Sequence, residues 1–222
     1  MPVDTFVHCL STFSALPQVF NPWLDYDPEH DIAAHAPEIR RANLRRYLAE
    51  RLEATKVVLI AEAPGKNGAK FSGIAMTSER ILLGKGSVSP EDVFRGEKQR
   101  TSRPELQASG FNEPTATVVW DMLVNQLKMD PRSFVLWNTF PFHPHQGEDR
   151  LSNRTPLPSE IERTQDILPA LLALFPRARV VAVGQIAKRR LDQMGVPADA
   201  VRHPSMGGAA AFRTGIQALS YS

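Results

Sequence analysis

Three short segments of the chain carry polar side chains that could act on a ligand. The AEAPG turn contains Glu62, and its backbone N–H groups could hold an oxygen atom that carries partial negative charge. In WNTFPFHPH, Asn138 is an amide that can offer one donor and one acceptor to the edge of a base. In HPS, His203 precedes a proline, which forces it into an extended conformation. These residue types suit hydrogen bonding to a polar ligand.

Each segment also has an ordinary structural explanation. A Pro-Gly turn after a strand is common, and a glutamate in such a turn is usually solvated. A buried asparagine such as Asn138 can tie down a neighbouring loop, because leaving its amide unpaired costs about 1–3 kcal/mol. A single histidine such as His203 is more often structural than catalytic. The MGGAAAF segment that follows it has the composition of a wedge that enters a duplex, or of a tight turn.

Short apolar runs alternate with helical patterns along the chain. Strands are predicted at 57–61, 133–140 and 178–184, with a fourth at 200–202, and helices at 36–54, 115–128, 158–175 and from about 212. Unbroken apolar strands that alternate with helices are typical of a parallel sheet covered on both faces. The pattern therefore predicts an α/β fold, a three-layer α/β/α sandwich with a central, mainly parallel four-stranded sheet. No linker divides the chain, so one domain over residues 1–222 is expected.

The predicted sheet also indicates where a site should lie. In open sheets of this kind, ligands bind outside the carboxyl ends of the strands. Glu62, Asn138 and His203 each stand at or directly after the end of a predicted strand. We therefore expect these three side chains to meet at one edge of the sheet. The stretch 85–113 is polar and irregular, and it is expected to be an excursion on the surface.

The composition is that of an ordinary soluble globular protein, with 222 residues, 42% of them hydrophobic, and a net charge of +2. Cys9 is the only cysteine, which excludes an internal disulfide and a thiolate-bound cluster or zinc site within the chain. No apolar run approaches the roughly 20 residues that a membrane helix needs, and the N-terminus has no secretory signal pattern. We expect a cytoplasmic protein without membrane contact.

The basic residues are bunched although the net charge is small. RRANLRR occupies 40–46, a KRR run begins at Lys188, and Arg213 lies among further arginines near the C-terminal end. Such bunching fits a phosphate-binding face, although a solvated helix surface explains each run equally well.

Taken in order, these segments resemble the uracil-DNA glycosylase superfamily, in particular its bacterial and archaeal branch that carries an iron–sulfur cluster. AEAPG matches the GE(A/G)PG turn of that branch, with Ala61 in place of the first glycine. NGAKFSGIAMTSERIL resembles its Gly-x-Pro-Phe-like stretch, with Phe71 at the aromatic position. NRTPLPSEI at 153–161 and then HPS follow in the order of the family. The resemblance spans about residues 57–213, but the four cysteines of the cluster are absent.

The resemblance implies a pocket for a base that has been flipped out of the DNA stack. Phe71 would stack on the uracil ring, in a pocket that Ala63 and Gly65 help to form. Asn138 would donate to O4 and accept from N3–H, a pattern that cytosine cannot match. His203 would hydrogen-bond O2 and stabilise the departing anionic base, together with backbone N–H groups of the first turn.

Two positions of the first turn differ from those of relatives. Ala63 stands where the superfamily has its strongest water-activating aspartate, which leaves Glu62 to position water or to stabilise positive charge on the sugar. Gly65 stands where other relatives hold a tyrosine against the C5 methyl group of thymine. Either another side chain crowds C5, or thymine is excluded less strictly.

The resemblance also implies contacts with the DNA. Met206, Gly207 and Gly208 would enter the space that the flipped base vacates, and Lys188 and Arg213 would contact phosphates. No lysine occupies a motif position from which it could form a Schiff base, so no lyase activity is expected. Neither a metal nor another cofactor is expected.

The implied function is that of a monofunctional DNA glycosylase which removes uracil in base excision repair and acts as a monomer. Two alternatives remain open. The enzyme acts on another deaminated or modified base, such as hypoxanthine, xanthine or a 5-substituted uracil, or the chain is a non-catalytic nucleic-acid-binding module on the same fold. An unrelated nucleotide hydrolase is disfavoured, because the sequence has no Walker-type GxxxxGK(S/T) loop.

Overall fold

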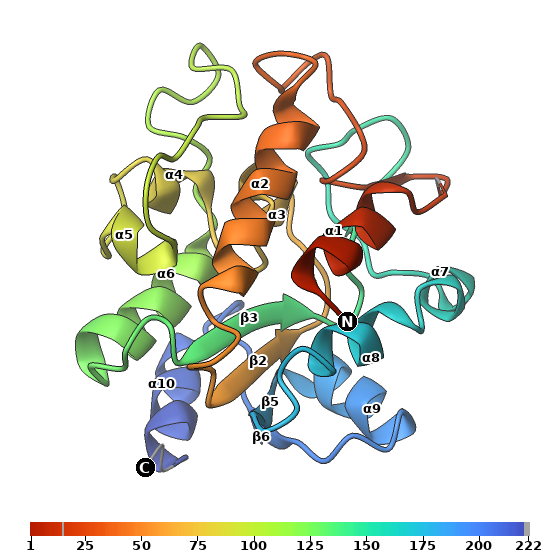
Figure 1. Ribbon diagram of the computed structural model, residues 1–222. Coiled ribbons are helices and arrows are strands. Elements are labelled where there is room, and N and C mark those ends of the chain that lie inside the picture. The colour runs from red at the N-terminus through yellow and green to blue at the C-terminus, as the bar shows by residue number, and fades with distance from the viewer. Residues whose placement is uncertain (15, 220–222) are drawn as a thin grey trace.

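A four-stranded parallel sheet forms the centre of the protein, with strand order β3-β2-β5-β6 (Figure 1). The computed structural model describes residues 1–14 and 16–219. The strands are β2 (Val57–Ala61), β3 (Phe134–Asn138), β5 (Arg179–Val183) and β6 (Asp199–Val201). Every residue of β2 and β3 is buried, which explains why both strands read as unbroken apolar runs. The predicted four-stranded parallel sheet is confirmed.

Helices cover both faces of this sheet, and a small antiparallel pair lies beside it. The remaining elements are α1 (Val3–Ser11), β1 (Val19–Phe20), α2 (Ala36–Ala49), α3 (Ala69–Ser72), α4 (Glu79–Leu82), α5 (Pro90–Val93), α6 (Pro114–Trp120), the π-helical turn η1 (Asp121–Gln126), β4 (His143–Pro144), α7 (Pro158–Arg163), α8 (Ile167–Leu172), α9 (Gln185–Gln193) and α10 (Ala209–Ala218).

The two helical layers are fixed by different contacts. From α2, the hydroxyl group of Tyr47 accepts a hydrogen bond of 2.8 Å from the amide of Leu136 in β3. On the other side, α9 packs against β2, β5 and β6. Figure 1 shows α2 on one side of the sheet and α8 and α9 on the other. The predicted three-layer α/β/α arrangement is therefore confirmed.

Two helices that the sequence predicts as continuous are each broken in two. The segment predicted at 115–128 forms α6 and then the π-helical turn η1. The segment predicted at 158–175 forms α7 and α8, separated by Thr164 and the two residues after it. Pro169 lies in the first turn of α8, where its missing N–H is tolerated but a helix running through from α7 would clash with it.

The stretch 85–113 differs most from its prediction. It contains α5, whose N-terminus carries a capping box formed by Ser89 and Asp92. Val93 and Phe94 are fully buried, and Phe111 is 6% exposed. The expectation of a surface excursion is therefore only partly confirmed. More than half of the residues of the stretch are exposed, but these apolar side chains anchor it to the protein and bring its end to the site described below.

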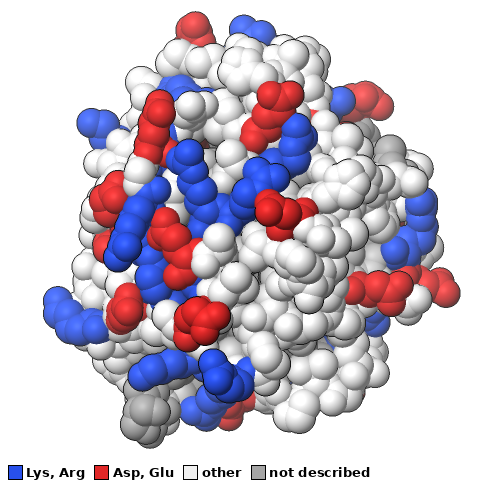
Figure 2. All heavy atoms as spheres, in the orientation of Figure 1, with Lys and Arg blue, Asp and Glu red and all other residues white. Residues whose placement is uncertain are grey.

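The basic run at 40–46 is largely used within the fold. Arg40 is fully buried, and its Nη1 lies 2.8 Å from Oδ1 of Asp31. Arg45 pairs with Asp4 on the surface. Figure 2 shows basic side chains of this face interspersed with acidic ones.

Within the described residues, no helix combines the length and apolar character needed to span a bilayer.

Candidate active site

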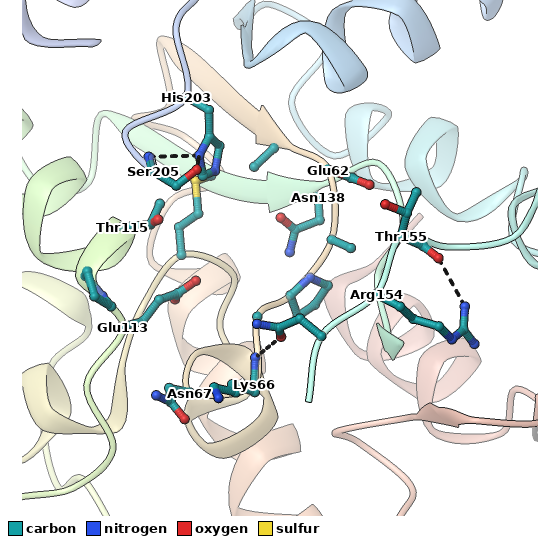
Figure 3. Close-up of a pocket in the computed structure, with 17 residues that line it drawn as sticks. Glu62, Lys66, Asn67, Glu113, Thr115, Asn138, Arg154, Thr155, His203 and Ser205 are labelled. Carbon is teal, nitrogen blue, oxygen red and sulfur yellow. Dashed lines mark hydrogen bonds between the residues drawn. The ribbon is translucent and has the colours of Figure 1, made fainter. Parts of the chain in front are cut away.

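A cavity of about 530 Å³ opens where β2, β3 and β6 end, within the size range of small-ligand sites (Figure 3). Its walls come from residues 61–67, Met76, 113–115, Asn138, 153–155, His203 and Ser205. The cavity lies at the carboxyl ends of parallel strands, which is where open α/β sheets bind their ligands. Glu62, Asn138 and His203 therefore share one cavity, and Ala63 and Gly65 also line it.

Asn138 is the last residue of β3, and its side chain enters the cavity from the sheet. It is only 2% exposed, and its neighbour across the strand pair is Ala61 of β2. Its Oδ1 atom is buried and has no hydrogen-bond partner among the described residues. A buried polar atom without a partner is costly, so an amide left open in this way is suited to bind a ligand.

Glu62 follows β2 directly, and backbone contacts hold it in place. Its carbonyl oxygen accepts hydrogen bonds from the amide of Phe140 and from the Thr139 hydroxyl group, each 2.9 Å long. Burial raises the pKa of the Glu62 carboxyl group, while the Thr155 hydroxyl group and Arg189 lower it in part. The Oε1 atom is buried and has no hydrogen-bond partner among the described residues.

Two contacts from distant segments fix the turn after Glu62. The ring of the buried His143 lies with Nδ1 3.0 Å from the carbonyl oxygen of Pro64, to which a proton on Nδ1 would donate. Asn153 accepts a hydrogen bond of 2.9 Å through its Oδ1 from the backbone amide of Lys66. The segments that contain HPH and NRTP thus position the first turn.

His203 lies after β6 in a tight turn that sets its tautomer. The backbone N–H of Ser205 can only donate, and it lies 3.1 Å from Nδ1 of the ring. Nδ1 therefore accepts, and a neutral ring carries its proton on Nε2, from which it can donate. Burial, together with the charge of Arg202, lowers the pKa of His203 and favours this neutral form. Gly184 allows His203 to lie close to the end of β5, since a Cβ on Gly184 would be only 3.1 Å from Cβ of His203.

The structure places Phe71 outside the cavity, so its assignment as the base-stacking residue is wrong. Phe71 is fully buried in α3, and its ring stacks on Phe111 with centroids 4.0 Å apart and planes at 8°. The ammonium group of Lys70 lies 4.2 Å from the centroid of the same ring. The Phe71 ring thus contacts Phe111 and Lys70 inside the protein and is not available to stack on a base. Met76, five residues later, is the large apolar side chain that lines the cavity.

The residues expected to contact DNA differ in exposure and in their partners. Met206 is 93% exposed and Gly207 follows it, both with positive φ, at 52° and 75°. Met206 therefore presents a large apolar side chain to solvent on a backbone in the left-handed region. Both features cost free energy in the free protein, and this cost is compatible with a side chain that acts as a wedge in DNA. Lys188 pairs with Asp192 on the surface of α9. Neither Met206 nor Lys188 lines the cavity.

Two further predicted DNA contacts, Gly208 and Arg213, are less exposed. Gly208 is buried, and its amide donates to the carbonyl oxygen of Ser205. A Cβ at Gly208 would collide with the carbonyl oxygen of His203, so this glycine shapes the turn and is withdrawn as a DNA contact. Arg213 is half-buried in α10, and its Nε has no hydrogen-bond partner among the described residues.

Sequence reasoning missed Glu113 and Met76, which both line the cavity. Glu113 precedes α6 and stands at the end of the segment interpreted as a surface excursion. No motif spacing identifies it, because its place in the site depends on how the preceding 28 residues fold. Met76 could have been found from the NGAKFSGIAMTSERIL stretch, in which the apolar side chain for the cavity was sought at Phe71 instead.

One group of potential metal ligands lies outside the cavity. Asp27, Glu29 and His30 each offer a ligand atom, and these atoms lie within 4.8 Å of one another. Burial alone would raise the pKa of Asp27, but Lys70, whose Nζ lies 2.8 Å from Oδ2, lowers it below its ordinary value. A buried ammonium group already balances this carboxylate, and we assign no metal there.

The fold and site define an α/β protein with a partly polar cavity at the carboxyl ends of its strands. The family model described as the Uracil DNA glycosylase superfamily matches residues 50–219. The chain therefore belongs to the uracil-DNA glycosylase superfamily, which makes it by class a DNA glycosylase, a hydrolase of the bond between base and sugar.

The solved structures agree with this membership at the level of the fold. The chain is similar to Pedobacter heparinus SMUG2, known from a crystal structure of the wild-type protein. The TM-score is 0.64 at 12% sequence identity, and the match covers 99% of this chain and 98% of that chain. No curated protein matches the sequence significantly.

Proposed function

We propose that this protein excises uracil from DNA by hydrolysis of the glycosidic bond, without lyase activity. The observation that carries the proposal is that three residues lining one cavity each have a buried oxygen atom without a hydrogen-bond partner among the described residues: Oε1 of Glu62, Oδ1 of Asn138 and Oε2 of Glu113. More than about 90% of buried polar groups in proteins are paired. Three exceptions around one cavity support a ligand that brings polar groups of its own, as a flipped base does.

The first step is extrusion of the nucleotide. A base inside the duplex cannot reach the cavity, and flipping it costs a few kcal/mol. The exposed side chain of Met206 is the natural candidate to enter the vacated space, because apolar wedges of this kind stabilise unstacked steps. Its position after His203 places the wedge next to the mouth of the cavity.

Recognition of uracil is assigned to Asn138. Its amide donates to O4 and accepts from N3–H, and cytosine presents the opposite pattern of donor and acceptor. A site that hydrogen-bonds its substrate can reject an analogue that leaves buried groups unpaired by about 10⁴ or more. The buried and unpaired Oδ1 of Asn138 supports this assignment, since it needs a donor from the ligand.

Cleavage leaves an anionic base and a sugar with oxocarbenium character. His203 stabilises the base by donating from Nε2, the nitrogen that carries the proton when Nδ1 accepts from Ser205. Glu62 lies at the other side of Asn138 in Figure 3, where its carboxylate form can position water or stabilise positive charge on the sugar. No proton transfer from His203 is needed, since the neutral ring already has a donor.

A broader range of bases is the second candidate. Among the described residues that line the cavity there is no Phe, Tyr or Trp. Gly65 leaves open the space that a side chain there would fill, with Oε1 of Glu113 3.5 Å from the position of a Cβ. A cavity without a bulky ring at these points supports acceptance of 5-substituted uracils or deaminated purines.

The test is release of base from labelled oligonucleotides that each carry one uracil, hypoxanthine, xanthine, 5-substituted uracil or thymine, in single and double strands. We expect uracil to be released, and Asn138→Ala to slow release about 30-fold to about 1,000-fold, the equivalent of about 2–4 kcal/mol for a lost donor and acceptor. Asn112→Ala, on an exposed asparagine outside the cavity, is the matched control. Tight binding of uracil DNA without release of any base would instead support a non-catalytic binding module.

A further inference from the structure

Glu113 brings a second carboxyl group into the cavity from outside the strand ends. It stands at the N-cap position of α6 in extended conformation, with φ −106° and ψ 111°, and its side chain makes no capping hydrogen bond. Figure 3 shows the carboxyl group pointing toward the centre of the cavity, from the side opposite Thr155 and with Asn138 between them. The side chain therefore faces the ligand space and leaves the helix end uncapped.

The first turn is shaped around this carboxyl group. A Cβ built on Gly68 would collide with Oε2 and the carboxyl carbon of Glu113, at 2.2 and 2.7 Å. A Cβ on Gly65 would lie 3.5 Å from Oε1. Glycine at both positions leaves the carboxyl group a niche against the turn that also carries Glu62.

The carboxyl group is buried without a compensating partner. Its Oε2 has no hydrogen-bond partner among the described residues. Burial, the one cause of the shift, raises the pKa of Glu113 to about 7. The cationic groups that line the same cavity, Lys66 and Arg154, do not offset this effect, and neither do the titratable side chains of Glu62 and His203. Arg154 is held by the carboxylate of Glu160, and Lys66 is exposed.

The two protonation states of Glu113 would act in opposite ways on a leaving base. A protonated carboxyl group has an O–H donor, which can donate to the second lone pair of a base carbonyl oxygen that already accepts from Asn138 or His203. An ionised carboxylate would instead place a negative charge beside a base that departs as an anion. Two like charges in a cavity shielded from water repel each other more strongly than in bulk solvent.

We propose that Glu113 is a base-recognition residue that donates a hydrogen bond from its protonated carboxyl group to an acceptor atom of the flipped base. The hydrogen bond strengthens as negative charge develops on the base, and no proton is transferred. The substrate class that fits is a base with a carbonyl oxygen where deamination has replaced an amino group, because this oxygen accepts a hydrogen bond. The inference rests on the proposed function, because it assigns a residue to the same base cavity.

The test compares wild type with Glu113→Gln, which keeps the shape and a donor but cannot ionise, and with Glu113→Ala. Single-turnover release of uracil is followed from about pH 5.5 to about pH 9 at constant ionic strength. We expect the ratio of the wild-type to the Glu113→Gln rate to fall about tenfold per pH unit above about pH 7, because one proton is lost. Glu113→Ala should be slow at every pH.

The matched control is Glu105→Gln, which alters an exposed glutamate of the segment leading to Glu113 and should follow the wild-type profile. Identical pH profiles of wild type and Glu113→Gln would overturn the proposal. The proposal would also be overturned if Glu113→Gln released base as slowly as Glu113→Ala below about pH 6, where the wild-type glutamate and the glutamine are both neutral.

A second readout separates this inference from the proposed function. An oligonucleotide with 2′-fluoro-2′-deoxyuridine resists cleavage, because fluorine disfavours positive charge on the sugar. Its affinity for the wild type should weaken above about pH 7, while its affinity for Glu113→Gln should not. Failure of base release with this binding pattern intact would refute the glycosylase proposal alone. A pH-independent ratio of the two affinities would refute the role of Glu113 whether or not base is released.

Discussion

Replacement of Glu113 by glutamine should stabilise the protein at alkaline pH and have no pH-linked effect in acid. Burial raises the pKa of this carboxyl group from its ordinary 4.5 to about 7 in the folded protein. An acid whose pKa is raised on folding binds its proton more tightly in the folded state. Its stability contribution is therefore complete below about pH 4.5 and declines as pH rises to about 7, where the folded state also ionises.

The magnitude follows from the size of the shift. A difference of about 2.5 pKa units at about 1.36 kcal/mol per unit corresponds to about 3 kcal/mol. Wild type should lose this amount relative to Glu113→Gln between about pH 4.5 and about pH 7.5. For a chain of this length the difference amounts to about 6–12 °C in melting temperature. Any cost of the glutamine amide itself is the same at every pH, so only the pH-dependent part is diagnostic.

Urea denaturation of both proteins across this pH range measures the effect directly. The free energy of unfolding of Glu113→Gln minus that of wild type should rise by about 3 kcal/mol from about pH 4.5 to about pH 7.5 and then level off. Glu105→Gln, on an exposed side chain, should show no such rise. A difference that stays constant with pH would show that the Glu113 carboxyl group is solvated or paired, and the reasoning from burial would be refuted.

Three other changes probe the roles assigned in the cavity and its wedge. His203→Ala should reduce single-turnover base release by about 10²–10³, because it removes a preorganised donor to the leaving base. Glu62→Ala should lower turnover and leave residual activity, since the histidine and the recognition amide remain. Met206→Ala should slow release from duplex DNA by about tenfold or more and from single strands much less, because unstacking a paired base costs a few kcal/mol.

Matched substitutions decide whether these losses are specific. His8→Ala, on an exposed histidine of α1, should leave base release unchanged. Leu106→Ala removes another exposed apolar side chain, 46% accessible, and should not affect the ratio of duplex to single-strand rates. An unchanged turnover in Glu62→Ala would remove Glu62 from the mechanism. Equal effects of Met206→Ala on both substrates would argue against a wedge.

The strands and their order along the chain could be read from the sequence, because a parallel sheet covered on both faces needs strands that are apolar throughout. β2 and β3 are short unbroken runs of this kind, and every one of their residues is buried. The same reasoning placed Glu62, Asn138 and His203 at one edge, since parallel strands end together. The apolar pattern of the strands and their parallel direction were sufficient to predict that these three residues lie near one another.

The remaining parts of the cavity depend on contacts between residues distant in the sequence. Phe71 and Met76 belong to one short segment, and only packing against Phe111 decided which of them entered the core and which the cavity. Glu113 follows a polar stretch with no motif, and its carboxyl group reaches the site because Gly65 and Gly68 leave room for it.

The sequence by itself determined the sheet, the edge at which the cavity opens and three of the residues that line it. Tertiary structure alone decided which apolar side chain lines the cavity, which basic residues form internal ion pairs, and that the carboxyl group of Glu113 is buried in the cavity wall. The physical reason is that desolvation and steric fit arise from all the neighbours of a group, and most of those neighbours are far away along the chain.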